Sequence, residues 1–194
     1  MVDIATGWSI QRAMWGKGEN GVIQALQTIE ITLPFKIKGF DSDNGSEFLN
    51  WSLFKYFKNR KFPVTYTRSR SYHKNDNAHI EGKNWTLIRQ YLGYERFDNP
   101  KIVKLLNEFY MTEWYLFINF FLPSSKLITK ERIGSKIIKK YDKPQTPFER
   151  LLKFKEIDKD VKEVLRLQFK KLNPYYLEKQ IQEKIRKIYD LLWR

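Results

Sequence analysis

The sequence contains no cysteine, which excludes disulfides, thiolate metal sites and a cysteine nucleophile. It also lacks an apolar run of the roughly 18 residues that a bilayer requires. Its most apolar window, WYLFINFFL (114–122), is much shorter and indicates buried core. The first ten residues have neither a basic region nor a long apolar region, so no secretory signal is expected. We therefore expect a cytoplasmic protein with no membrane partner.

Acidic residues are absent from one long stretch, between Glu47 and Asp76. The formal net charge is +14, although the first fifty residues hold more acids than bases. The acid-free stretch holds these basic residues: Lys55, Lys58, Arg60, Lys61, Arg68, Arg70 and Lys74. Such a patch favours a polyanionic partner, because lysine and arginine that neutralise phosphates release counterions. The alternative is a solvated, lysine-rich surface, since net charge alone is a weak argument for a partner.

Hydrophobic periodicity predicts a layered α/β domain in the first half of the chain. The expected order is strand, strand, helix, strand, helix, strand. The segments are a hairpin turning at ATG (5–7), a helix from Val22 to Pro34, a strand over 35–43, a helix over 46–60 and a strand over 62–67. A further helix is expected at 77–92, with Gly93 as its C-cap. In such layered domains, polar sites gather where the strands end.

The second half of the chain is expected to be mostly helical. The whole chain is expected to divide into three regions. A long apolar helix after Pro100 should pack on the sheet and end at Pro123, which closes a region spanning 1–123. Residues 124–155 are basic and contain Pro144 and Pro147, so they indicate an arm or linker. A C-terminal helical segment, 156–194, contains amphipathic helices at about 156–172 and 174–193.

Two carboxylates stand out from these elements. Asp43 falls where a predicted strand ends, in the stretch FDSDNGSEF (40–48). Glu81 heads a predicted helical stripe formed with Trp85, Ile88 and Leu92, which should face the sheet. Each has an ordinary alternative: Asp43 in an Asp-Asn-Gly turn, and Glu81 as a first-turn glutamate favoured by the helix dipole.

Together, the two carboxylates and the basic loop between them suggest metal-dependent phosphoryl transfer. Carboxylate oxygens are the ligands that Mg²⁺ and Mn²⁺ prefer, and two such ions can activate a nucleophile and stabilise a leaving oxygen. We therefore expect Asp43 and Glu81 to bind Mg²⁺ or Mn²⁺, with the neighbouring basic loop holding DNA.

The stretches DSDNGSEF (41–48) and TRSRSYHKNDNAHIEGKN (67–84) resemble the catalytic core of DDE transposases and retroviral-type integrases, particularly bacterial insertion-sequence transposases. The resemblance extends to about residue 123, and YDKPQTPFERLL (141–152) is similar to the segment that follows the core. It implies a ribonuclease H-like layered core, a mixed sheet flanked by helices, with a helical C-terminal extension.

The resemblance also implies roles for individual residues. Asp43 and Glu81 would be the second and third metal-binding acids of the catalytic triad. The residues expected to contact DNA are Arg68, Arg70, Tyr72, Lys74, Asn77, Lys83 and Asn84. The implied partners are transposon ends and target DNA, together with another copy of this chain or a full-length transposase.

The first acid of the triad has no convincing match in this sequence. VDIATGWS (2–9) resembles the family's second strand and its turn, so Asp3 is not expected to be that acid. The first strand and its aspartate would then lie upstream of Met1, and we expect a truncated core lacking that strand. Two functions remain open at this point: metal-dependent cleavage and strand transfer in DNA integration, or a non-catalytic remnant that binds DNA or pairs with full-length transposase.

Overall fold

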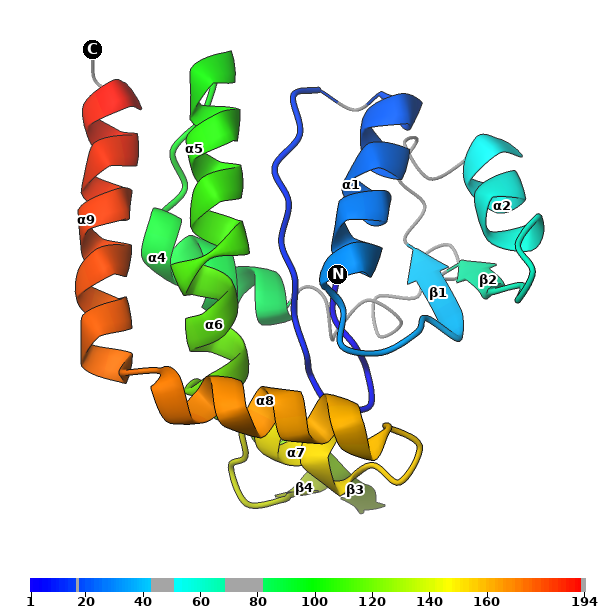
Figure 1. Cartoon of the computed structure of the whole chain (residues 1–194). Helices are drawn as coiled ribbons and strands as arrows, with labels where there is room; N and C mark the ends of the chain where they lie inside the picture. The colour runs from blue at the N-terminus through cyan, green and yellow to red at the C-terminus, as the bar shows by residue number, and fades with distance from the viewer. Residues whose placement is uncertain (17, 43–50, 69–81, 193–194) are drawn as a thin grey trace.

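The computed structural model describes residues 1–16, 18–42, 51–68 and 82–192, which form a mixed α/β structure (Figure 1). Its named strands make two small sheets, one parallel pair and one antiparallel pair. Helices contribute most of the buried core. No helix in these ranges is both long and apolar enough to span a membrane.

The N-terminal turn has the predicted position, but the two segments beside it form only an isolated bridge instead of paired strands. Val2 and Ser9 form an isolated antiparallel bridge, and Gly7 turns the chain with a φ of 81°. The Asp3 carboxylate accepts hydrogen bonds from the backbone N–H and hydroxyl of Thr6 at 2.7 and 2.5 Å, so Asp3 shapes this turn. Ile4 is 65% exposed because it lies in the turn itself.

A small α/β unit follows, and its core combines aliphatic side chains with stacked aromatic rings. The elements are α1 (Glu19–Thr32), β1 (Gly39–Ser42), α2 (Trp51–Lys58) and β2 (Thr65–Arg68). Helix α1 buries Val22 and Leu26 against Phe57 of α2. Phe40 of β1 stacks on Phe57 with ring centroids 4.8 Å apart. The predicted helices and strands of this unit are therefore present in the predicted order.

A second core forms around the long apolar segment, which is not one helix. It divides into α5 (Pro100–Met111) and α6 (Glu113–Phe120) at Thr112, whose backbone leaves the helical region. The Thr112 hydroxyl donates to the carbonyl of Glu108 at 2.6 Å, a back-bond that bends helices. Both helices pack against α9 (Pro174–Leu192), as Figure 1 shows, so the expected packing of this segment on the sheet is not what the fold uses.

Two asparagine amides hold the extended N-terminal segment against α5 and α6. Asn119, fully buried, accepts from the Ser9 N–H and donates to the Ser9 carbonyl, both at 2.8 Å. Asn107 makes the same pair of bonds with Ala13, at 2.9 and 3.0 Å. These side chains replace the neighbouring strand that an extended backbone otherwise requires.

Replacing Asn119 with Leu should lower the free energy of unfolding by about 2–4 kcal/mol, because the buried Ser9 N–H and carbonyl would both lose their partners. Denaturant unfolding measures this loss. Thr86→Val is the matched control, since that hydroxyl bonds a carbonyl of its own helix near the surface and its removal should cost less than about 1 kcal/mol. Equal losses in the two variants would show that the hydrogen bonds between Asn119 and Ser9 contribute little to the free energy of unfolding.

The remaining elements lie below these cores in Figure 1. Strands β3 (Leu127–Ile133) and β4 (Lys136–Tyr141) form a hairpin, and α7 (Pro147–Lys153) and α8 (Lys159–Lys171) follow it. Helix α7 begins with a capping box, in which Thr146 and Glu149 bond each other's backbone N–H groups. The predicted C-terminal helices are α8 and α9, and Pro174 begins α9 as expected.

Candidate nucleic-acid interface

The parallel pairing of β1 with β2 brings two chain segments of the predicted site to one edge. Ser42, the last residue of β1, is paired in register with Arg68, the last residue of β2. Ser42 is buried, and its hydroxyl lies 3.0 Å from that of Tyr66. Because the strands are parallel, both carboxyl ends lie at the same edge, the position where α/β sheets bind ligands. Asp43 is the next residue in the chain after Ser42.

Several predicted site residues lie outside the described part of the chain. These are Asp43, Arg70, Tyr72, Lys74, Asn77 and Glu81. Within the described ranges, no group of three or more histidine or acidic side chains is placed to hold a metal ion. The Mg²⁺ or Mn²⁺ site at Asp43 and Glu81 therefore stays a prediction.

Arg68 lies at the carboxyl edge of the parallel pair. Its side chain is exposed, and its guanidinium carbon is 5.8 Å from the centroid of the Tyr66 ring. An arginine resting near an aromatic face keeps its hydrogen-bond donors available for a phosphate. This placement is compatible with the predicted DNA contact.

Not every basic side chain of the acid-free stretch is available to bind a partner. Arg60 donates to the carboxylate of Glu30 at 2.8 Å and lies over the Tyr56 ring, 4.2 Å from its centroid. Lys58 lies over the Phe54 ring, 5.2 Å from its centroid. Arg60 therefore joins α2 to α1, and the positive charge of this stretch has in part a structural role.

The helix that carries Lys83 and Asn84 contains a π-helical turn. Residues Trp85–Arg89 form the π-helix η3, and α4 (Gln90–Leu92) continues it to Gly93, whose φ is 61°. Short π-helical turns are rare and occur frequently at functional sites. Asn84 lies just before this turn and is exposed.

The π-turn changes which residues face the core. The sequence predicted an inward stripe through Trp85, Ile88 and Leu92, but Trp85 is 52% exposed. Leu87 and Leu92 are the buried residues, five positions apart, which is the spacing of i→i+5 bonding. The stripe was therefore wrong at Trp85, and it gives no support for an inward-facing Glu81.

Lys83 is half-buried beside other cations. Burial lowers the pKa of Lys83, and the charges of Lys126 and Arg150 lower it further. No described carboxylate lies within ion-pair distance of Lys83. A half-buried ammonium among like charges costs stability, and a phosphate would offset that cost.

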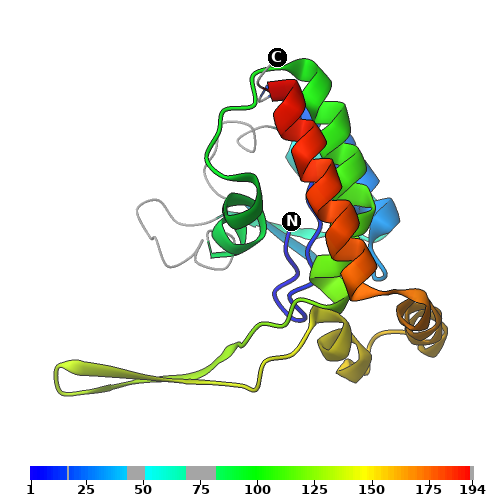
Figure 2. The ribbon, with the colours of Figure 1, turned by 90° about the vertical axis from the view of Figure 1, so that its left-hand side faces the viewer.

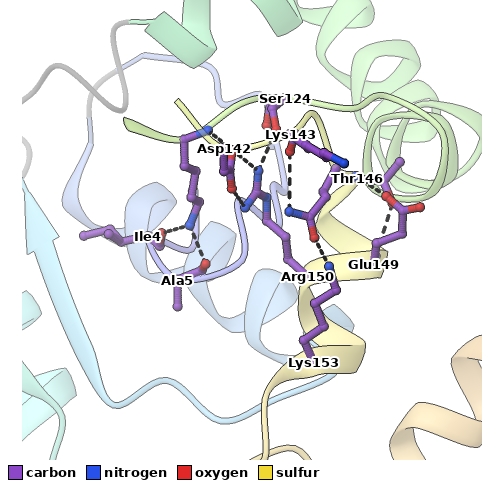
Figure 3. A network of polar contacts seen from close by, with 11 residues as sticks. Ile4, Ala5, Ser124, Asp142, Lys143, Thr146, Glu149, Arg150 and Lys153 are labelled. Atoms are coloured by element: carbon purple, nitrogen blue, oxygen red, sulfur yellow. Dashed lines mark hydrogen bonds and ion pairs between the residues drawn. The ribbon is translucent and has the colours of Figure 1, made fainter. Parts of the chain in front are cut away.

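Arg150 belongs to a polar junction that the sequence did not reveal (Figure 3), and the hydrogen bonds of Lys126 make it part of the same junction. Arg150, only 7% exposed, donates to both carboxylate oxygens of Asp142 at 2.5 and 3.1 Å and to the carbonyl of Ser124 at 2.7 Å. Lys126 donates from its backbone to Asp142 and from its ammonium to the carbonyls of Ile4 and Ala5. The junction thus joins the base of the β3–β4 hairpin to α7 and to the N-terminal turn.

Replacing Lys83 with Met should stabilise the fold and weaken DNA binding together. Because the pKa of Lys83 is lowered on folding, its charged form opposes folding at neutral pH, and that cost disappears only as the pH rises toward the pKa of the unfolded chain. We expect a melting temperature higher by about 2 °C and a dissociation constant for DNA weaker by about 5-fold. Calorimetry and fluorescence anisotropy measure the two effects.

Lys104→Met is the control, because Lys104 is an exposed lysine of α5. It should change neither quantity appreciably. Loss of stability in Lys83→Met without loss of DNA affinity would assign Lys83 a structural role.

Comparison with known proteins finds a relative from Sinorhizobium fredii, the uncharacterized protein y4rM, which is 36% identical over 150 residues. The alignment covers 77% of this chain and 42% of the relative, so the chain spans less than half the length of that protein. No protein-family model and no solved structure matches the chain. These comparisons identify a related protein without assigning an activity.

Proposed function

We propose that the chain contributes an integrase-type transposase core that binds DNA and, with Mg²⁺ or Mn²⁺, cleaves and joins phosphodiesters. The observation that carries the proposal is the parallel β1–β2 edge. There, Ser42, the last residue of β1, is paired with Arg68 of β2. The predicted metal ligand Asp43 is the next residue after Ser42 in the sequence.

The order of elements supports a ribonuclease H-like core as the finer description of the fold. A tight N-terminal turn precedes α1, and β1, α2 and β2 then form a β-α-β unit with parallel strands. A parallel pair needs such a crossover, and helices pack over it to cover the sheet. The similarity of DSDNGSEF (41–48) to the family's second acid then falls at the expected end of β1.

In this proposal each part of the site has its own task. Asp43 and Glu81 hold the metal, which would supply an activated nucleophile and charge stabilisation at the phosphodiester. Arg68, which lies between the two acids in the sequence, and Lys83, which follows Glu81, bind phosphates. Ser42 and Tyr66, through their hydroxyl contact, hold the strand ends in register.

The same structure supports a second candidate, a protein that binds DNA without chemistry. Arg68, which is exposed, and Lys83, which has no described carboxylate within ion-pair distance, can attract phosphate without a metal ion. This candidate shares the DNA-binding surface of the first and differs only at Asp43 and Glu81.

Two assays test the proposal. The chain should bind duplex DNA that carries the terminal repeats of its transposon, with an affinity that falls steeply as the salt concentration rises. Adding Mg²⁺ or Mn²⁺ should then produce strand-transfer products. Salt-dependent binding without products, in either metal, would favour the non-catalytic candidate. A chain that does not bind duplex DNA at low salt contradicts both candidates.

A further inference from the structure

The β3–β4 hairpin projects away from the rest of the structure (Figure 2). Every residue from Lys130 to Tyr141 is exposed, although the hairpin carries several large apolar side chains. Seven residues of β3 at about 3.3 Å each make an arm roughly 23 Å long. Gly134, with a φ of 63°, provides the conformation that its two-residue turn requires. The arm is thus a twisted two-stranded ribbon with little of its surface buried.

The strand register sorts the side chains of the arm onto two faces. Lys130 lies opposite Lys139, and Arg132 lies opposite Ile137, so these four residues share one face. We call this the cationic face. The pairs on the other face are Thr129 with Lys140, Glu131 with Ile138, and Ile133 with Lys136.

The charge on this arm is unfavourable for the protein alone. From Lys130 to Lys140 there are five cations and one carboxylate, and Lys130 faces another lysine directly. Like charges opposite each other destabilise a strand pair, and an isolated hairpin is marginally stable even without them. An anionic partner lying along the cationic face removes the repulsion.

The shape of the arm selects duplex DNA among anionic partners. A two-stranded β-ribbon fits the major groove, where cations reach phosphates and guanine edges, and an apolar side chain contacts the thymine methyl group. Ile137, placed among the cations, has the character for such a contact.

The base of the arm is fixed beside the cations of the candidate interface. Ser124 and Gln145 pair through backbone bonds of 3.0 and 3.2 Å, and the Arg150–Asp142 pair closes the junction above them. Lys126, at the start of the arm, and Arg150 are near enough to Lys83 to act on its charge. In Figure 2 the η3–α4 helix and the arm extend toward the same side of the molecule.

We propose that β3–β4 is a DNA-binding arm whose cationic face, Lys130, Arg132 and Lys139, lies against the duplex next to the segment bound by Lys83. This proposal rests on the proposed function, because it requires that the chain bind DNA. It adds a contact surface to the DNA-binding residues that the resemblance in sequence implied.

The test compares two variants that each remove three positive charges. The arm variant combines Lys130→Gln, Arg132→Gln and Lys139→Gln, and the control combines Lys159→Gln, Lys170→Gln and Lys171→Gln on exposed positions of α8. Anisotropy of a labelled duplex is measured over a series of salt concentrations. The arm variant should bind about 10–100-fold more weakly near 0.1 M salt, with the slope of log affinity against log salt reduced by about 2 to 3, and the control should stay within about 3-fold of the wild type.

The outcomes separate the arm from the proposed function. If the wild type binds DNA and the two variants weaken binding equally, the arm proposal is wrong and the proposed function stands. If the wild type does not bind DNA, the proposed function is wrong, and the arm proposal, which rests on it, is wrong as well. Circular dichroism should show a melting temperature for the arm variant equal to or slightly above that of the wild type, since its three side chains are exposed and their mutual repulsion is removed. A lower melting temperature would assign them a structural role and overturn the proposal.

A proximity measurement gives an independent readout. The chain has no cysteine, so Ser135→Cys puts a lone thiol at the tip of the arm for a photo-crosslinker. Crosslinks to duplex DNA are expected. Crosslinks to a second protein chain in place of DNA would overturn the proposal and make the arm a self-association element.

Discussion

Asp43→Asn and Glu81→Gln are each expected to lower metal-dependent strand transfer on the order of 10³-fold, while DNA affinity changes by less than about 3-fold. Either substitution keeps the side-chain size and removes the negative charge that a divalent ion needs. Removing one acid also makes the site less repulsive to phosphate, so DNA binding should be equal or slightly tighter. Single-turnover assays with Mg²⁺ and Mn²⁺, run beside anisotropy measurements, give both quantities.

Asp41→Asn is the matched control, because Asp41 lies on β1 and only two residues before Asp43 in the sequence. Its exposed carboxylate accepts a hydrogen bond from the Thr67 hydroxyl at 2.6 Å, which fits a role in strand pairing. Strand transfer should fall by less than about 5-fold in this variant. Equal losses in Asp41→Asn and Asp43→Asn would contradict the specific role given to Asp43.

Arg150→Ala is expected to lower the melting temperature by about 5–10 °C. The substitution removes a buried guanidinium that bonds both oxygens of Asp142 and the carbonyl of Ser124. Breaking such a pair from one side leaves the Asp142 carboxylate without its cation, which is costly in a partly buried position. Because the same contacts hold the base of the β3–β4 arm, DNA binding should weaken as well.

Arg166→Ala provides the comparison for that loss. Arg166 pairs with Glu163 at 3.1 Å on the exposed surface of α8, and surface ion pairs of this kind contribute little. Its melting temperature should stay within about 1–2 °C of the wild type. If Arg150→Ala and Arg166→Ala have the same melting temperature, the junction in Figure 3 does not stabilise the fold.

The junction also has a signature in acid. The Arg150 guanidinium, followed by the Lys126 backbone N–H, lowers the pKa of Asp142 from its ordinary 3.8 to about 2. The stability that Asp142 contributes is therefore fully present above pH 3.8 and lost as the pH falls through about 2. In Arg150→Ala, nuclear magnetic resonance titration should show the pKa of Asp142 returning toward 3.8.

Sequence patterns predicted the regular elements better than their packing. The periodicity of Val22, Leu26 and Ile29 correctly predicted α1 and its buried face, and Pro174 marked the start of α9. Local propensity and apolar spacing are enough for such elements. The strand end at Ser42 was also predicted to within a residue, so the sequence located the edge at which Asp43 follows.

Features set by tertiary contact were beyond these patterns. The π-turn at Trp85–Arg89 buries Leu87, leaves Ile88 partly buried and exposes Trp85, and a window with a period of 3.6 residues does not predict that pattern. Asn107 and Asn119 look like polar interruptions of apolar helices, yet each binds a backbone segment about a hundred residues away. The Arg150–Asp142 pair likewise had no signal apart from the spacing of two charges.

Direct measurement of metal binding tests the central claim, that Asp43 and Glu81 together hold a divalent ion at the β1–β2 edge. Mn²⁺ titrations followed by electron paramagnetic resonance would be run on the wild type and on Asp43→Asn, Glu81→Gln and Asp41→Asn. We expect one saturable site, or a closely spaced pair, in the wild type and in Asp41→Asn, with binding at least about 10-fold weaker in the other two variants. Equal Mn²⁺ binding in all four proteins, or no binding by the wild type, would contradict the claim.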